Sequence, residues 1–109
     1  AQEQPAAAPS DPAAQLGQRV FVSAGCVFCH MVRGLDDKSV DRSAIDLGPD
    51  LTHLSSRLTI AGGSLSQNRG NLAGWVLDPQ HVKPGTPMPN QYINAEDLQT
   101  LLAYLATLQ

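Results

Sequence analysis

The segment Cys26-Val27-Phe28-Cys29-His30 constrains this chain more than any other feature. It places two thiols three residues apart, and a histidine follows the second thiol directly. On a helical turn the two cysteines project from one face, so each can form a thioether to a porphyrin vinyl group while the imidazole turns toward the iron. The spacing therefore predicts that Cys26 and Cys29 attach a haem c covalently and that His30 is an axial ligand.

Three other interpretations of the cysteine pair stay open at this point. A C-x-x-C pair also occurs as a structural disulfide, as a thioredoxin-like redox pair and as half of a zinc site. A thioredoxin-like pair would need a surrounding βαβ pattern, and a closed zinc site would need four nitrogen or sulfur ligands. The chain holds only these two cysteines and three histidines, His30, His53 and His81, so we favour haem attachment.

The segment Lys83 to Asn90 offers a second iron ligand, Met88. Three prolines and a glycine oppose a helix there and stiffen the loop around the methionine. A thioether and an imidazole together raise the reduction potential of a haem iron, as in electron-transfer cytochromes. Met31 follows His30 directly and cannot reach the opposite face of the ring. We predict His30 and Met88 as the axial pair, with simple packing of Met88, or ligation by a second histidine, as the alternatives.

Length, composition and charge agree with a small cofactor-containing domain. The 109 residues suit one domain, and an aromatic content of 5% is a thin supply for its core, which a buried haem would supplement. The formal net charge of −3 argues against a nucleic-acid partner, which needs a basic face. The sequence shows no apolar run of the length that a transmembrane helix needs.

Residues 1–12 are almost all alanine, proline, glutamine and small polar residues. This composition cannot pack into a core, so it predicts a flexible linker ahead of one domain at residues 13–109. The chain begins without methionine, and we expect that a signal peptide has been removed or that the domain comes from a longer polypeptide.

Helical periodicity dominates the rest of the chain. Asp11 and Pro12 form a start signal, and apolar residues recur at helical spacing from there to Ala24. A short helix is expected over 71–77, and a leucine-rich helix after an Asn94 cap. The stretches 33–47 and 59–70 are expected to be loops. Without an alternating strand pattern, the predicted fold class is all-α, with the helices packed around one haem.

Along nearly its whole length after the linker, the chain resembles a class I cytochrome c. The resemblance is carried by the haem motif, by the Pro-Gly-x-x-Met loop that ends at Met88, and by three short segments: Gly17 with Phe21, Gly48-Pro49-Asp50-Leu51, and Leu101-Leu102-Ala103-Tyr104-Leu105. It implies that Gly17 lets the first helix cross the last helix closely near Tyr104.

The resemblance also implies roles for four residues around the haem. The carbonyl of Pro49 would accept a hydrogen bond from the second ring nitrogen of His30, which fixes the imidazole. Leu51 would pack on the haem face, Arg57 would lie where a propionate partner is usual, and Trp75 would take a ring position beside the Met-side pocket.

More narrowly, segments 48–57, 71–75 and 78–85 are similar to the cytochrome c domain fused to subunit II of some bacterial haem-copper oxidases. This similarity implies a monomeric one-electron carrier that relays electrons from a respiratory donor to the copper centre of a terminal cytochrome c oxidase. It also implies a place outside the cytoplasm, in the periplasm or on the outer face of the membrane, and a tether through the linker to a membrane-anchored copper domain. In that family His53 is not an iron ligand, and we expect it at the surface or beside a propionate.

Two other functional classes stay open from the sequence. A free periplasmic cytochrome c that serves a dehydrogenase or reductase would have the same site. A haem enzyme or gas-binding domain would need an open sixth position on the iron. The sequence offers no catalytic constellation of its own, so we expect an electron-transfer domain that docks through an apolar rim around the haem edge.

Overall fold

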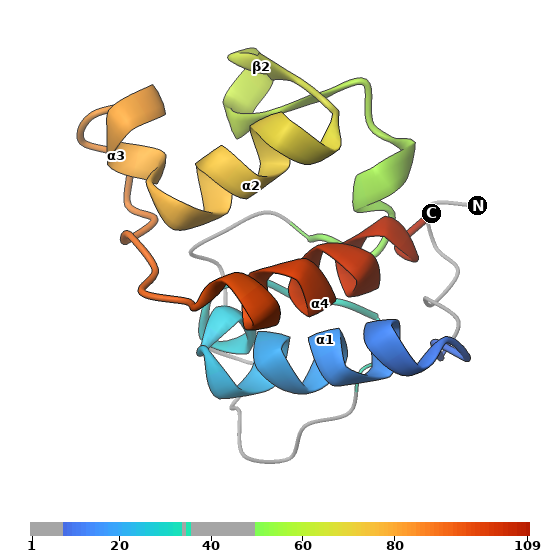
Figure 1. Ribbon diagram of the computed structural model, residues 1–109. Helices are drawn as coiled ribbons and strands as arrows, with labels where there is room; N and C mark the ends of the chain where they lie inside the picture. The colour runs from blue at the N-terminus through green and yellow to red at the C-terminus, as the bar shows by residue number, and fades with distance from the viewer. Residues whose placement is uncertain (1–7, 34, 36–49) are drawn as a thin grey trace.

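The computed structural model describes residues 8–33, 35 and 50–109. Its α-helices in this part are α1 (Pro12–Ser23), α2 (Arg69–Leu77), α3 (Pro79–Val82) and α4 (Ala95–Ala106). Short 3-10 turns lie at η1 (Cys26–Phe28), η3 (Leu54–Ser56) and η4 (Ala61–Gly63). In Figure 1, α1 and α4 lie side by side, and α2 and α3 form a second layer beside α4. The all-α prediction is confirmed, and none of the described helices is long and apolar enough to cross a membrane.

Helix α1 begins and ends where its sequence signals indicate. Asp11 is the N-cap, and its Oδ2 accepts a hydrogen bond from the Ala14 backbone N–H at 3.3 Å, while Pro12 takes the first helical position. Gly25 adopts a left-handed backbone with φ 83°, directly after the Ala24 C-cap. This glycine ends the helix and turns the chain into η1.

Helix α4 also follows its prediction. The Oδ1 of the Asn94 cap accepts a hydrogen bond from the Asp97 N–H at 2.8 Å, and two acidic residues in the first turn face the positive end of the helix dipole. The predicted apolar stripe is buried along its whole length, and it comprises Leu98, Leu101, Leu102, Leu105 and Leu108. Leu108 lies beyond the end of the helix and is fully buried.

The middle of the chain differs from the prediction. Helix α2 begins at Arg69, two residues before the expected start, because the Asn68 side chain caps it and accepts from the Asn71 N–H at 2.8 Å. The Asp78-Pro79 pair ends α2 as expected, but it also begins α3, with the Asp78 side chain accepting from the His81 N–H at 3.2 Å. This is the same start signal as Asp11-Pro12.

The stretch 59–70 is not simply the loop that we expected. It contains a two-stranded antiparallel ladder of β1 (Thr59–Ile60) and β2 (Leu65–Ser66), followed by the start of α2. The chain reverses through three successive left-handed residues, Ala61, Gly62 and Gly63. Glycines adopt this conformation without strain, so the Gly62-Gly63 pair permits a tight hairpin. Of the expected linker and the loop at 33–47, residues 1–7, 34 and 36–47 lie outside the described part.

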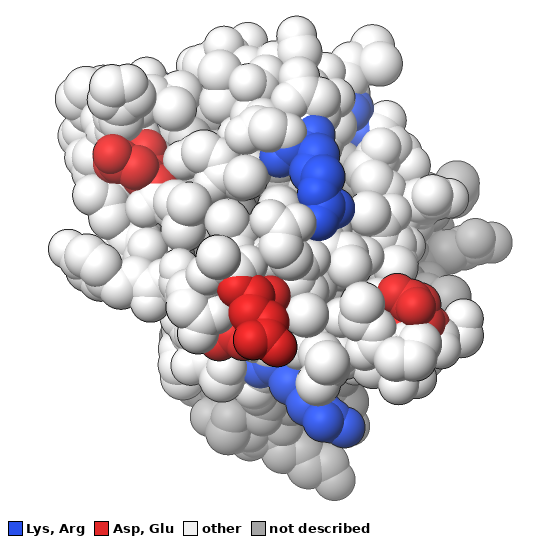
Figure 2. Space-filling view, in the orientation of Figure 1, with Lys and Arg blue, Asp and Glu red and all other residues white. Residues whose placement is uncertain are grey.

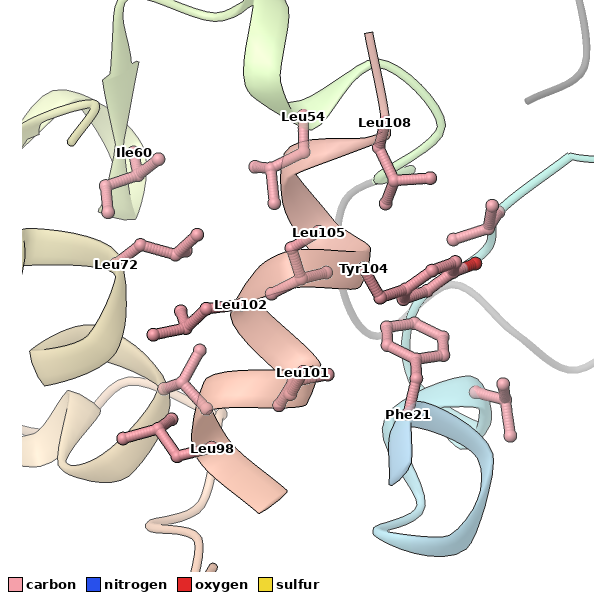
Figure 3. Close-up of a cluster of buried hydrophobic side chains, with 13 residues drawn as sticks. Phe21, Leu54, Ile60, Leu72, Leu98, Leu101, Leu102, Tyr104, Leu105 and Leu108 are labelled. Carbon is pink, nitrogen blue, oxygen red and sulfur yellow. The ribbon is translucent and has the colours of Figure 1, made fainter. Parts of the chain in front are cut away.

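Helices α1 and α4 cross at Gly17 with no room for a side chain. A Cβ atom at Gly17 would lie 1.7 Å from the Thr100 carbonyl oxygen and 2.8 Å from the Tyr104 Cβ. One turn further along, the rings of Phe21 and Tyr104 pack edge to face, with centroids 5.6 Å apart and an interplanar angle of 63°. Figure 3 shows these rings facing one another on one side of α4, while Leu54, Ile60 and Leu72 lie on its other side. The close crossing implied by the resemblance is therefore present.

We predict that Gly17→Ala lowers the free energy of unfolding by about 1–3 kcal/mol, because the added methyl group forces the two helices apart. The matched control is Gly74→Ala on α2, where a Cβ would meet no atom within 4 Å. That change should be neutral or stabilising by less than about 1 kcal/mol. Urea unfolding followed by circular dichroism measures both, and equal effects of the two substitutions would contradict the argument.

Candidate haem site

A cavity of about 940 Å³ is bounded by α1, α2 and α4 and by the loops around them. Its volume is at the upper end of the range for small-molecule and cofactor sites. Apolar side chains from every bounding element line it: Phe21, Leu51, Leu54, Ile60, Leu72, Trp75, Val76, Leu101 and Leu105. Several of these also belong to the buried core, so the cavity is continuous with the interior of the domain.

The segment after α1 brings both cysteines and His30 to the cavity wall. In this turn the backbone N–H groups of Cys29 and His30 both donate to the Cys26 carbonyl, at 3.2 and 2.9 Å. The two cysteines are free thiols and not a disulfide. Burial raises the pKa of the Cys26 thiol to about 11, so this thiol is neutral at pH 7.

Met88 lines the same cavity from the loop between α3 and α4. As predicted, residues 83–90 form no helix, and Gly85 turns the chain with φ 86°. Met31 is not among the lining residues. The structure therefore brings together two thiols, an imidazole and one thioether that are separated by up to 62 positions in the sequence.

The two remaining histidines lie away from this wall. His81 is exposed on α3, and His53 is half-buried with its Nδ1 atom 2.5 Å from the Gln109 carbonyl oxygen. Neither lines the cavity, so His30 is its one histidine. Within the described residues, no group of three or more His, Cys, Asp and Glu side chains is placed to bind a metal ion.

Leu51, Arg57 and Trp75, to which the resemblance gave roles, all line the cavity. Arg57 is exposed, and its guanidinium donates a hydrogen bond to the Asp50 carbonyl. Pro49 lies outside the described residues, so its contact with His30 stays a prediction.

Lys83 was not among the predicted site residues. This exposed lysine also lines the cavity, and its Nζ would lie 2.9 Å from a Cβ on Gly62, in the turn of the β-hairpin. Lys83 and Arg57 thus place two cations on a wall that is otherwise mainly apolar. The Lys-Pro-Gly sequence marks a turn, but no local pattern shows that Lys83 lines the same cavity as Arg57.

A polar cluster around Asp50 joins the segment after His30 to the segment that leads into η3. Asp50 Oδ1 accepts from the Thr52 N–H at 2.9 Å and from the Thr52 hydroxyl at 2.5 Å, and Oδ2 lies 3.3 Å from Arg33 Nε. The buried Thr52 hydroxyl oxygen in turn accepts from the Arg33 N–H at 2.8 Å, and the Leu51 N–H donates to the Met31 carbonyl at 2.8 Å. These bonds hold Leu51 beside the haem motif.

Known proteins with a similar sequence support a haem site in this cavity. The sequence matches the family described as Cytochrome c over residues 14–109. The chain belongs to the cytochrome c family. This cytochrome c domain is 35% identical over 102 residues to cytochrome c oxidase subunit 2 of Alkalihalophilus pseudofirmus and of Bacillus strain PS3, and 32% identical over 97 residues to that of Bacillus subtilis.

These alignments cover 93%, 92% and 89% of this chain, but 27%, 27% and 26% of the relatives. The chain thus spans about a quarter of the length of the curated relatives it matches. Family membership and these relatives support haem-based electron transfer. The lining residues of the cavity also fit a haem. The large apolar wall suits the porphyrin ring, the sulfur and nitrogen donors suit the iron, and the two cations suit the propionate carboxylates.

We predict that Asp50→Asn lowers the free energy of unfolding at neutral pH. The difference in free energy of unfolding between this variant and wild type should become smaller as the pH falls. Burial alone would raise the pKa of Asp50, but hydrogen bonds from Thr52 and the charges of Arg33 and Arg57 outweigh it and lower the pKa. The ionised carboxylate therefore stabilises the fold above the unfolded-state pKa, and this contribution is lost as the pH falls through the lower folded-state pKa.

Urea unfolding at a series of pH values between 7 and 3 measures this difference. Thr52→Ser is the control, because it keeps the hydroxyl that donates to Asp50 and should retain the pH dependence of wild type. A difference between Asp50→Asn and wild type that stays constant, or grows, toward low pH would contradict the assignment.

Proposed function

We propose that this domain carries one haem c, held covalently through Cys26 and Cys29 with His30 and Met88 as axial ligands, and transfers one electron at a time. The observation that carries the proposal is that all four side chains line one largely apolar cavity. The haem supplies the one-electron chemistry when bound. The polypeptide attaches it, supplies the ligands and shields it from water.

The choice of Met88 as second ligand rests on which donors reach the cavity. His53, His81 and Met31 do not line it, whereas Met88 does. A methionine ligand favours ferrous iron, and an apolar surrounding also disfavours the extra charge of the ferric state. Both effects raise the reduction potential, which suits a carrier that delivers electrons to a terminal oxidase.

The remaining lining residues have distinct parts in this proposal. Leu51 would pack on the haem face and Trp75 would lie beside the Met-side pocket, and both would help to exclude water from the iron. Arg57 and Lys83 would neutralise the haem propionates, because carboxylates in an apolar wall need a cation nearby. Pro49 would fix the His30 ring through its carbonyl.

We further place the domain in an oxidase complex outside the cytoplasm. Support comes from the relatives named cytochrome c oxidase subunit 2, of which the chain matches about a quarter. The domain would relay electrons from a respiratory donor to the copper centre of the oxidase. The segment ahead of α1 would tether it to the membrane-anchored copper domain. A free periplasmic cytochrome c that serves a dehydrogenase or reductase is the alternative arrangement of the same site.

Surface properties favour docking through apolar contacts. Phe28, inside the haem motif, lines the cavity and is 58% exposed, and Leu58 beside Arg57 is 89% exposed. On the face in Figure 2, charged groups of both signs are scattered in small clusters between uncharged atoms. A net charge of −3 gives little long-range steering, so short-range apolar contact at the cavity rim would define a weak, transient complex of the monomeric domain.

We predict that Met88→His keeps haem attached but lowers the reduction potential, because a bis-histidine iron is less stabilised in the ferrous state. Voltammetry of the purified haem protein measures the change, and the ferric spectrum of wild type should show the long-wavelength band of sulfur ligation. Met31→Leu is the control and should leave the potential and the band unchanged. An unchanged potential in Met88→His would remove Met88 from the iron, and protein without bound haem would refute the whole proposal.

The partner assignment predicts fast oxidation of the reduced domain by an oxidase of the relatives' type that lacks its own cytochrome c domain. Stopped-flow spectroscopy at rising ionic strength measures the rate, which should change little because apolar contacts dominate docking. Phe28→Ser should slow the reaction, whereas Tyr92→Ser, at an exposed position that does not line the cavity, should not. If the oxidase oxidises the reduced domain no faster than an unrelated acceptor does, the assignment of an oxidase partner is wrong.

A further inference from the structure

The side-chain amide of Gln80 is fully engaged by the loop that carries Met88. Its Nε2 donates to the Thr86 carbonyl at 2.7 Å and to the Met88 carbonyl at 3.0 Å. Its Oε1 accepts from the Gly85 N–H at 3.0 Å. Both donor hydrogens and the acceptor oxygen of one amide therefore bind the backbone of Met88 and of the two residues Gly85 and Thr86 shortly before it.

The loop has little else to hold its backbone in place. Pro84, Pro87 and Pro89 carry no N–H group, so they cannot donate backbone hydrogen bonds. In the described part of the chain, three backbone–backbone bonds hold the loop. The Lys83 N–H donates to the Pro79 carbonyl at 2.9 Å, the Thr86 N–H donates to the Lys83 carbonyl at 3.1 Å, and at the far end the Gln91 N–H donates to the Leu77 carbonyl at 3.2 Å. A side chain from outside the loop thus supplies the bonds nearest to Met88.

Gln80 is itself held by the start of α3. Its neighbour Pro79 is fully buried, and the Asp78 side chain caps the helix by accepting from the His81 N–H. The Gln80 N–H lies 3.4 Å from Asn90 Oδ1, at the end of the loop. The half-buried Gln80 side chain therefore projects from a packed helix into the loop.

We infer that Gln80 is a positioning residue that keeps the Met88 sulfur at the iron by fixing the backbone of its loop. This inference rests on the proposed function, in which Met88 is an axial ligand. Gln80 is not itself a lining residue of the cavity, but it bonds to Thr86 and Met88, which are. It acts through the carbonyls of Thr86 and Met88.

The consequence is a control on how easily an external ligand replaces the methionine. A small base such as imidazole binds ferric iron at the sixth position only when the loop has moved Met88 away. The apparent affinity for imidazole is therefore the intrinsic affinity multiplied by the fraction of molecules whose loop is open. Removing the Gln80 bonds enlarges that fraction without altering the iron or its His30 ligand.

The test is an imidazole titration of the ferric haem protein, followed by loss of the sulfur-ligation band. Gln80→Glu keeps the length and shape of the side chain but has no hydrogen to donate to the two carbonyls. We expect it to bind imidazole at least about tenfold more tightly than wild type, since two hydrogen bonds no longer oppose opening.

The matched control is Gln67→Glu. Gln67 is also partly buried, and its Nε2 donates to the Leu54 carbonyl at 3.0 Å, away from the Met88 loop. It should lose stability but keep the imidazole affinity of wild type. An unchanged affinity in Gln80→Glu, or the same increase in both variants, overturns the inference.

A second variant covers failure of Gln80→Glu to fold. Gln80→Met has similar length, carries no buried charge and also lacks the donor hydrogens, so it should show the same rise in imidazole affinity. The wild-type spectrum separates the two proposals. If it shows no sulfur ligation, the proposed ligand Met88 and this inference fall together, whereas a normal wild-type band with unaltered Gln80 variants overturns the positioning role alone.

Discussion

The contact of α1 with α4 at Gly17 sets the positions of the other parts of this domain. Because Gly17 has no side chain, the backbone of α1 reaches the Thr100 carbonyl, and Phe21 packs edge to face on Tyr104. The same two helices present Phe21, Leu101 and Leu105 to the cavity. Only the Ala24 C-cap and the left-handed Gly25 separate α1 from the haem motif, so the crossing also fixes the position of Cys26.

The two sides of the cavity are organised by different physical means. On one side, the Cys26 carbonyl accepts hydrogen bonds within its own turn, so five consecutive residues supply two thiols and an imidazole. On the other side, prolines remove the donors that a loop would use to hold itself, and the amide of Gln80 replaces them. The proposed covalent attachment thus needs only local order, whereas the proposed thioether ligand depends on a contact from another element.

Several features were predictable because their cause is local. The caps at Asp11 and Asn94 act within three residues, and the leucine stripe of α4 repeats at helical spacing, so each was visible in sequence. Helix α3 was not predictable in the same way, because an Asp-Pro pair can end one helix and begin the next, and Asp78-Pro79 does both. The hairpin at 59–66 was missed because two residues per strand are too few to show alternation.

The sequence by itself determined the chemistry of the site, since the spacing of Cys26, Cys29 and His30 is a property of one helical turn. Only the tertiary structure decided which distant residues join them. It selected Met88 over Met31, His53 and His81 as a lining residue, and it brought Lys83 and Arg57 to the same wall. The physical reason is that these neighbours meet through packing of α2 and the loops against α4, and no periodicity along the chain records contacts between segments so far apart.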